Sequence, residues 1–387
     1  MPRVRDLVEA MGSVAPLALA EPWDNVGLIA GDAEAELAGP TLLTIDLDER
    51  VIAEAIEAGR GTPGAIVAYH PPIFGGIKRL TAETPRGRAL LRAIGAGFAL
   101  YSPHTALDAA AGGVADWLID QIGSGTDRAA LSAFAEVAGS QSHKVVCFVP
   151  VASPPCAPMV VVDQVRSAMA AAGAGRIGSY DECSFGVRGI GSFFGGAGTH
   201  PAVGARGRLE SVEEVRLEMV CSRRDLPAVI AALRVAHPYE EPAFDIHELA
   251  PRPDRNLGPG RVMTLEHPAS VEAIARRLAQ ALNIEGLQWA DAADGGPIER
   301  VAVCPGSGES LIPAALDHGA QVFITGEMKH HEALGALDLG LSLVLAGHTQ
   351  TERGYLPTLA RRLHELNPAL CATVSRTDRA PLRFLRP

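Results

Sequence analysis

Closely spaced cysteine pairs and long apolar runs are both missing from this sequence. The six cysteines among 387 residues include no pair with CxxC spacing, so neither a zinc ribbon nor a thioredoxin-type redox motif is present. No uninterrupted apolar stretch reaches the roughly 18 residues of a membrane-spanning helix. The first residues also lack the apolar core of a secretory signal peptide. We therefore expect a cytoplasmic protein with reduced thiols and no membrane partner.

Basic residues are in the minority as well. The chain has 34 Lys and Arg against 45 Asp and Glu, a net charge of −11. A nucleic-acid-binding face usually needs a basic patch, and Lys and Arg do not cluster here, so a nucleic-acid partner, a DNA-binding ring included, is disfavoured. With 47% hydrophobic and 20% charged residues, the composition is that of an ordinary globular protein. A chain of this length is expected to form two or three domains.

Helix-like and strand-like segments alternate at both ends of the sequence. Before residue 125, the apolar pattern predicts strands at 41–46, 65–69 and 97–101 and helices at 4–19, 50–58, 85–96 and 113–121. After residue 255 it predicts strands at 300–304, 320–324 and 342–346 and helices at 270–283, 309–318, 328–338 and 351–366. Such alternation is typical of βαβ units, so we expect a mostly parallel sheet.

The middle of the chain follows another pattern. Strands at 145–150, 212–220 and 243–249 and helices at 159–172 and 224–236 make two β-α-β passes, which favours a ferredoxin-like α+β module. Turn-rich segments border it on both sides. We therefore predict a discontinuous α/β core formed by residues 1–125 and 255–387, with an α+β domain of residues 140–250 inserted.

Three histidines follow predicted strands closely. His70 comes directly after one strand, and His104 and His348 each stand four residues before an acid, Asp108 and Glu352. In α/β sheets ligands bind beyond the carboxyl ends of the strands, and residues four apart share a helical face. Imidazole and carboxylate without thiolate point to Zn, Mn, Fe, Co or Ni. The alternative is that these residues cap helices or lie on the surface.

Two further strand ends carry residues suited to binding or acid–base chemistry. Residues 306–308 form a Gly-rich turn before a helix, which can hold a phosphate through backbone N–H groups, although the Walker lysine is absent. Glu327 and His331 follow the next strand and could act as acid–base groups, or simply lie on an exposed helix start. By spacing alone, residues 21–27 and 237–242 are best explained as structural turns.

Six short motifs, taken in order, resemble those of one family. They are Glu-Pro-Trp-Asp-Asn-Val-Gly at 21–27, Tyr-His-Pro-Pro-Ile-Phe at 69–74, Ser-Pro-His-Thr-Ala-Leu-Asp at 102–108, Pro-Gly-Ser-Gly at 305–308, Thr-Gly-Glu at 325–327 with His331, and Gly-His-Thr-Gln-Thr-Glu at 347–352. The chain resembles the Nif-three-like proteins with a dinuclear metal centre, often labelled GTP cyclohydrolase I type 2 homologues. Its middle segment resembles the PII/CutA-like domain that is inserted in the longer members.

The resemblance carries expectations about assembly and metal. It implies a two-lobed α/β core and a homohexamer, a trimer of dimers, whose metal sites face an internal cavity. The implied metal ligands are His70, His104, Asp108, His348 and Glu352. The family commonly has a His-His pair where this chain has Tyr69 and His70. Either Tyr69 ligates as a phenolate, or the second metal is weak or absent, so one or two ions per chain are expected.

The activity that these residues imply is hydrolysis of a small molecule. A bound metal would lower the pKa of water to about 7, His331 or Glu327 would transfer protons, and residues 306–308 would hold an anionic group. We therefore expect a metal-dependent hydrolase of a nucleotide-like or phosphorylated substrate, and the family label suggests GTP ring opening. The alternative is a non-catalytic metal-handling or regulatory ring whose insert senses a ligand. An open coordination position would favour the hydrolase.

Overall fold

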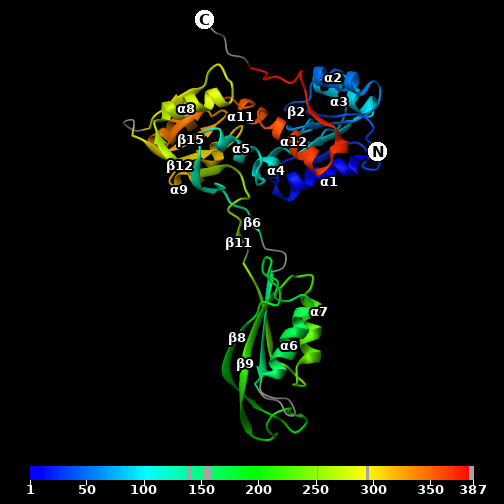
Figure 1. The fold of residues 1–387 in the computed structure, drawn as a ribbon, viewed down its shortest axis with the longest axis vertical. Coiled ribbons are helices and arrows are strands. Elements are labelled where there is room, and N and C mark those ends of the chain that lie inside the picture. The colour runs from blue at the N-terminus through cyan, green and yellow to red at the C-terminus, as the bar shows by residue number, and fades with distance from the viewer. Residues whose placement is uncertain (137–140, 152–158, 251, 293–295, 383–387) are drawn as a thin grey trace. The chain divides into compact units, whose positions relative to one another are not determined.

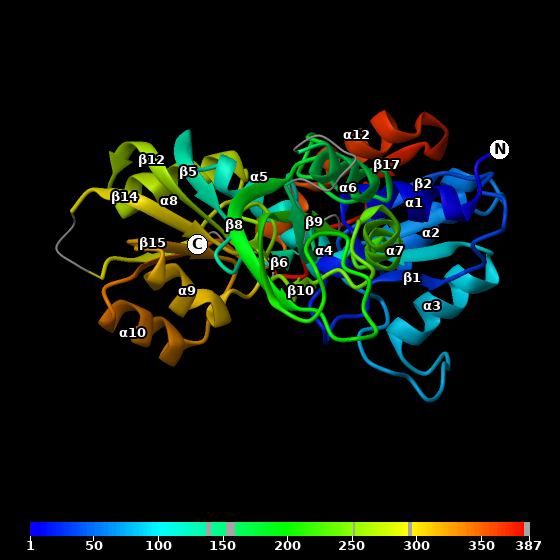
Figure 2. The same cartoon turned by 90° about the horizontal axis from the view of Figure 1, so that it is seen from below.

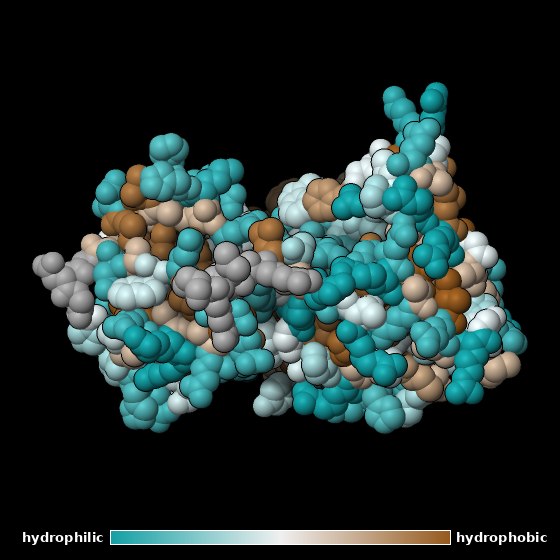
Figure 3. Space-filling view, turned by 90° about the horizontal axis from the view of Figure 1, so that it is seen from above, coloured by the Kyte–Doolittle hydropathy of each residue, from teal (hydrophilic) through white to brown (hydrophobic). Residues whose placement is uncertain are grey.

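The chain divides into two compact units in the computed structural model, which describes residues 1–136, 141–151, 159–250, 252–292 and 296–382. The first unit consists of Met1–Phe134 and Asp254–Pro387, and the second of Ala135–Pro253 (Figure 1). The two outer segments of the chain therefore fold together. Polar residues cover most of the face that Figure 3 shows, with apolar residues in separate patches. Among the described residues, no helix is long and apolar enough to cross a membrane.

The first sheet of the first unit has the strand order β1-β4-β3-β2-β17. Strands β4, β3, β2 and β17 run parallel, and β1 pairs antiparallel with β4. Helices α1 and α12 pack on one face and α2 and α3 on the other (Figure 1), and Figure 2 shows the same lobe from below. The elements of this lobe are β1 (Gly27–Ala30), β2 (Thr41–Thr44), β3 (Ala65–Ala68), β4 (Ala99–Ser102), β17 (Ala372–Val374), α1 (Val4–Val14), η1 (Leu17–Leu19), α2 (Glu49–Gly59), α3 (Pro85–Gly95), α4 (His104–Ala109), α12 (Leu356–Leu366) and η3 (Pro368–Leu370).

Successive side chains of β2 point to opposite faces of this sheet. Leu42 packs in the cluster of α2 and α3, whereas Leu43 packs in the cluster of α1 and α12. Because helices cover both faces, every residue of β2, β3 and β4 is buried. This explains why these strands are mostly apolar in the sequence and do not alternate between apolar and polar residues. The first polar side chains available for chemistry then lie just beyond the carboxyl ends of the strands.

The second sheet of the first unit has the order β13-β16-β15-β14-β12-β5. Its inner strands β14, β15 and β16 are parallel, and β13, β12 and β5 pair antiparallel. Helices α5 and α8 pack on one face and α9 and α10 on the other. The elements are β5 (Gly125–Ala129), β12 (Arg261–Ala269), β13 (Gln288–Ala290), β14 (Ile298–Val303), β15 (Val322–Thr325), β16 (Ser342–Leu345), α5 (Val114–Asp120), α8 (Val271–Ala281), η2 (Glu309–Leu311), α9 (Ile312–Asp317), α10 (His330–Asp338) and α11 (Gln350–Arg353).

The second unit is a four-stranded antiparallel sheet with two helices on one face. Its strand order is β10-β7-β9-β8, and α6 and α7 form its core with the sheet. The glycine-rich stretch at 186–196, for which the sequence predicted no element, lies mostly within the long strand β8. The likeness of this unit to PII and CutA modules stays a prediction. Its elements are β6 (Ala135–Glu136), β7 (His143–Pro150), α6 (Val160–Ala171), β8 (Phe185–Phe194), β9 (Leu209–Cys221), α7 (Leu226–Ala236), β10 (Phe244–Glu248) and β11 (Arg252–Pro253).

Three predicted helices are shorter or broken in the structure. The helix predicted at 351–366 is two helices, because α11 ends at Arg353 and α12 begins at Leu356 with a proline in its first turn. The helix predicted at 4–19 ends at Val14, two residues before Pro16, and the one predicted at 309–318 is split before Pro313. Proline is tolerated in a first turn but not in a helix interior. The apolar pattern continues across each break, so periodicity alone predicted one helix.

The segment after β17 is anchored by one carboxylate of α2. Glu54 Oε2 accepts hydrogen bonds from Ser375 Oγ, Thr377 N and Thr377 Oγ1, and Oε1 accepts one from Arg376 N. Burial would raise the pKa of Glu54, but these hydrogen bonds lower it to about 2, from an ordinary value of 4.5. The folded pKa lies below the unfolded one. The stabilisation is therefore complete above about pH 5 and is lost as the pH falls toward about 2.

We expect Glu54→Gln to lower the free energy of unfolding by about 1–3 kcal/mol at neutral pH. The difference from the native chain should shrink steadily below about pH 5, because Glu54 of the unfolded native chain takes up a proton there while the folded chain, with a pKa of about 2, does not. Urea unfolding at a series of pH values measures the loss of stability and its dependence on pH. Glu57→Gln, an exposed carboxylate on the same helix, is the matched control and should change stability by less than about 0.5 kcal/mol. A Glu54→Gln deficit that stays constant from neutral pH to about pH 3 contradicts this account.

Candidate metal centre

The six side chains predicted as metal ligands all line one cavity of the first unit. Its volume is about 360 Å³. Four of the six follow strands β3 and β4 of the first sheet, and two follow β16 of the second sheet. The carboxyl ends of parallel strands from both sheets thus meet at this cavity, as expected for an α/β ligand site. The six residues are Tyr69, His70, His104, Asp108, His348 and Glu352.

Three of these residues form a group with the spacing of metal ligands. Ligand atoms of His70, His348 and Glu352 all lie within 4.8 Å of one another. Glu352 Oε1 lies 3.3 Å from His348 Nε2, and Oε2 lies 3.5 Å from His70 Nε2. The Glu352 side chain is only 3% exposed, and its Oε2 has no hydrogen-bond partner among the described residues. An unpartnered buried carboxylate oxygen is costly. Because a divalent cation would satisfy it, the residues present fit a metal.

A carboxylate lies at the Nδ1 atom of each histidine in the cavity. Such a partner fixes the ring and its tautomer and leaves Nε2 free to bind a metal. The sequence prediction did not include Asp46, favoured a structural turn for the segment that contains Asp24, and assigned acid–base chemistry to Glu327. The signal for them was weak, because one ends a strand and another lies in a segment that reads as a turn. The pairs are His70 with Asp46 at 2.9 Å, His104 with Asp24 at 2.8 Å, and His348 with Glu327 at 3.0 Å.

His104 is held in an uncommon backbone conformation. Its φ is +31°, which L residues rarely adopt. The Asp24 side chain beside it is 0% exposed, and accepts hydrogen bonds from Thr105 Oγ1 at 2.5 Å and Thr105 N at 3.1 Å. Strained residues persist where surrounding contacts over-determine them. The ring of His104 lies 5.4 Å from that of His70, centroid to centroid, so it borders the three-residue group.

Tyr69 is engaged with Asp108. Its buried hydroxyl donates a hydrogen bond to Asp108 Oδ1 at 2.5 Å. Burial and then the negative charges of Asp108 and Glu352 raise the pKa of Tyr69 well above its ordinary value, and burial raises the pKa of Asp108 to about 7. In this structure Tyr69 is therefore a neutral donor. That Tyr69 and Asp108 ligate a metal stays a prediction.

His70 lies between two carboxylates. Burial would lower its pKa, but the hydrogen bond to Asp46 and the negative charge of Glu352 raise it to about 10. The ring thus holds a proton at neutral pH when no cation is bound. A metal has to displace that proton, so metal binding at this site should release it.

We expect Asp46→Asn to weaken metal affinity by about 10- to 100-fold, because an amide orients the His70 ring less firmly and makes it a weaker base. Competition with a chromogenic chelator measures the affinity. The control is Glu57→Gln, which changes an exposed carboxylate of the same lobe. An Asp46→Asn chain with native affinity would show that the carboxylate does not support the ligand.

The two residues predicted as acid–base groups, His331 and Glu327, lie in different surroundings. His331 is exposed on α10, and its recorded ring contact within the described part of the chain is with His330. Its acid–base role stays a prediction. Glu327 Oε1 accepts a hydrogen bond from Ser307 Oγ and lies at the Nδ1 atom of His348, so its observed contact is one that orients the histidine.

The Gly-rich turn packs directly against the three-residue group. A Cβ atom at Gly306 would lie 2.8 Å from Glu352 Oε1 and 3.2 Å from His348 Nε2. The Gly306 amide already donates to Thr351 Oγ1 at 2.9 Å, so it is not free for a phosphate. That residues 306–308 hold an anion stays a prediction. The contact that the structure shows is the close approach of glycine to the candidate ligands.

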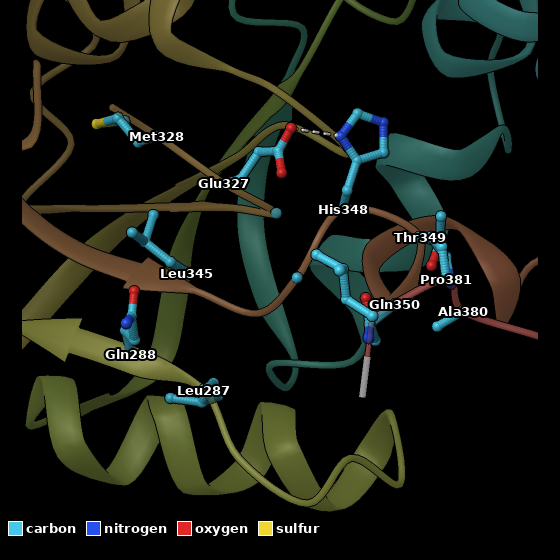
Figure 4. A pocket seen from close by; sticks show the side chains of 13 residues that line it. Leu287, Gln288, Glu327, Met328, Leu345, His348, Thr349, Gln350, Ala380 and Pro381 are labelled. Atoms are coloured by element: carbon cyan, nitrogen blue, oxygen red, sulfur yellow. Dashed lines mark hydrogen bonds and ion pairs between the residues drawn. The ribbon is translucent and has the colours of Figure 1, made fainter. Parts of the chain in front are cut away.

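Glu327 and His348 also line a second cavity, of about 450 Å³. Figure 4 shows the hydrogen bond between them at its wall, with Leu345, Gln350 and Leu287 around the same space. His348 is thus shared by two cavities. Its orientation by Glu327 determines which way Nε2 points, toward Glu352 in the first cavity.

Proteins of two bacteria are similar to this chain over most of its length. The chain is 37% identical over 336 residues to a Mycobacterium leprae protein named GTP cyclohydrolase 1 type 2 homolog, covering 86% of this chain and 82% of that one. It is 33% identical over 384 residues to the Bacillus subtilis protein of the same name, covering 98% of each. These names describe the relatives.

Solved structures and a family model agree with these relatives. A Bacillus cereus protein related to NIF3 matches with a TM-score of 0.69 at 31% identity over 99% of both chains. A Staphylococcus aureus protein matches with a TM-score of 0.76 at 25% identity, also over 99% of both. The family model described as Duf34/NIF3 (NGG1p interacting factor 3) matches residues 2–381. The predicted resemblance and the α/β fold class are thereby confirmed, and the chain belongs to the Duf34/NIF3 family.

Proposed function

We propose that this chain is a metal-dependent hydrolase of a nucleotide-like or phosphorylated small molecule. The observation that carries the proposal is the group of His70, His348 and Glu352, in which one buried carboxylate oxygen has no hydrogen-bond partner among the described residues. A divalent ion, one of Zn, Mn, Fe, Co or Ni, would supply a bound water with a pKa of about 7 and polarise the scissile bond. His104 and Asp108 border this group and would serve a second ion.

The residues of the chain contribute positioning and proton transfer. Asp46 and Glu327 hold two histidine rings in place through Nδ1. Because the rings are already oriented, the reaction needs no further free energy to reorganise them. Where no second ion is bound, Asp108, with a pKa raised to about 7 by burial, can take up or release a proton at its carboxylate near neutral pH. Tyr69 holds that carboxylate through its hydroxyl.

An accessible cavity favours catalysis over storage. A storage or structural site is closed by protein ligands, whereas a catalytic one keeps a position for water and substrate. The candidate ligands line a cavity of about 360 Å³, which is the size of a small-molecule site. The alternative function, a metal-handling or regulatory ring with a ligand-sensing insert, predicts a metal that exchanges without turnover.

Turnover assays separate the two functions. The purified chain would be loaded in turn with each of the five metals and incubated with GTP and with simple phosphate esters, while ring opening and phosphate release are followed. The proposal predicts metal-dependent turnover that is lost in Glu352→Gln and kept in Glu57→Gln. Bound metal with no turnover of any of these compounds would favour the metal-handling role. The native mass in solution tests the homohexamer that we propose with it.

A further inference from the structure

Two large aromatic side chains stand exposed at the mouth of the candidate metal cavity. Trp23 is 59% exposed and Phe74 50% exposed, and both line the cavity together with His104 and Glu352. Their ring centroids lie 5.7 Å apart, with planes tilted by 42°. We call this pair the aromatic wall. Single exposed apolar side chains are ordinary, but a contacting pair at the rim of a polar cavity is what a binding site presents.

Contacts with the metal centre fix the Trp23 side of the wall. Trp23 directly precedes Asp24, whose fully buried carboxylate is held by His104 and Thr105. The Trp23 ring also meets the His104 ring edge to face, with centroids 6.1 Å apart. Trp23 therefore cannot shift far without disturbing the partner that orients His104.

A hydrogen bond between two loops fixes the Phe74 side of the aromatic wall. Asn25 Nδ2 donates a hydrogen bond to the carbonyl oxygen of Ile73 at 2.5 Å, which joins the two loops that carry the aromatic rings. The Phe74 ring lies 6.2 Å from the His104 ring, again nearly perpendicular. The wall is thus preorganised before any ligand arrives, and binding to a fixed surface loses less conformational entropy.

The aromatic wall is chemically suited to binding a planar ring. Exposed aromatic faces bind planar heteroaromatic rings by stacking, which contributes about 1–3 kcal/mol per base in nucleic-acid complexes. Glu21 lines the same cavity, and no hydrogen bond of its carboxylate is recorded within the described part of the chain. That carboxylate can accept from N–H groups at the edge of such a ring.

We propose that Trp23 and Phe74 form a subsite that stacks the planar, N–H-bearing heteroaromatic ring of the substrate beside the metal ligands. The inference rests on the proposed function, because it names the part of the substrate that the enzyme holds while the metal ligands face the reacting group. It gives the motif at 21–27 two roles, since Asp24 orients a ligand and Trp23 binds the ring. It also extends the motif at 69–74 from His70 to Phe74.

Calorimetric titration with guanosine 5′-monophosphate tests the subsite, with ribose 5-phosphate as the ligand that lacks the ring. We expect Trp23→Leu and Phe74→Leu each to weaken binding of the nucleotide by about tenfold or more. Trp23→Phe should retain most of the affinity. Trp289→Leu is the matched control, because Trp289 is also exposed but lies on β13 away from this cavity. Ribose 5-phosphate should bind more weakly than the nucleotide and equally to all variants.

Metal content and solution mass, measured on the same samples, separate the possible failures. Nucleotide binding that is unchanged in both leucine variants, or absent from the native chain, overturns the aromatic subsite even where the metal is present. A native chain that stacks the nucleotide but holds no metal keeps the subsite and removes the proposed function. Leucine variants that change the oligomeric mass and leave nucleotide affinity intact would show the wall to be a contact between copies, which also overturns the proposal.

Discussion

Gly306→Ala is expected to abolish metal binding in a chain that still folds. The added Cβ atom would lie 2.8 Å from Glu352 Oε1, closer than a carbon atom can approach, and 3.2 Å from His348 Nε2, a tight contact from which the ring would have to shift. The backbone of Gly306 also has a φ of +65°, which an L residue adopts only with strain. Glu352 has little room to withdraw, since its side chain is 3% exposed. The ligand atoms must therefore separate, and we expect affinity to fall by at least about 100-fold.

Metal content after dialysis, with the far-ultraviolet circular dichroism spectrum as a check of folding, measures this effect. Gly335→Ala is the matched control, because Gly335 lies in α10 of the same lobe with open space where its Cβ would be. That variant should keep the native metal content and is expected to be slightly more stable. A Gly306→Ala chain with native metal content would mean that the three-residue group does not bind the metal.

Arg261→Met is expected to lower the free energy of unfolding by about 3–5 kcal/mol, the largest stability effect that we predict. Arg261 is 1% exposed and forms an ion pair with Asp116 at 2.9 Å. Its guanidinium also donates hydrogen bonds to five backbone carbonyl oxygens, those of Ala109, Ala110, Asn256, Gly258 and Gly260. Methionine fills a similar volume but removes these donors from the Asp116 carboxylate and from the five carbonyl groups, and loss of hydrogen bonds to buried acceptors is costly.

Chemical denaturation of Arg261→Met beside Arg128→Met provides the comparison. Arg128 also lies near Asp116, at 3.6 Å, but its side chain is 37% exposed, so its loss should cost less than about 1 kcal/mol. Arg261→Lys keeps the charge and loses the planar fork, and should fall between the two. Equal losses for Arg261→Met and Arg128→Met would contradict the role given to the buried guanidinium. An Arg261→Met chain that does not fold at all, beside a folded Arg128→Met, agrees with it.

The ends of the buried parallel strands could be predicted from the sequence because such strands have a simple, mostly apolar pattern. Strands β2, β3 and β4 are covered on both faces, so each is a mostly apolar run that stops where the polar site begins. His70 and His104 could be placed at one sheet edge on that basis. Strands β1, β13 and β17 have at most one buried residue each. Their patterns are short and mixed, and the sequence predicted none of them.

The partners of the histidines were harder to find, because they depend on contacts between distant segments. Asp24 and His104 are 80 positions apart, and Glu327 and His348 are 21 apart. Nothing in the spacing of a single carboxylate tells which ring it will meet. The shared helical face predicted for His331 and Glu327 is not formed, because α10 begins only at His330, and His331 is exposed.

The metal content of the chain, purified at neutral pH without added metal or chelator, tests the central claim most directly. We predict about one or two ions per native chain and almost none in Glu352→Gln, whose amide cannot replace the unpartnered carboxylate oxygen. In Tyr69→His, two ions against one in the native chain would show that Tyr69 limits the second position. Two in both would show that Tyr69 is tolerated. A native chain without metal, or a Glu352→Gln chain with native content, would contradict the account.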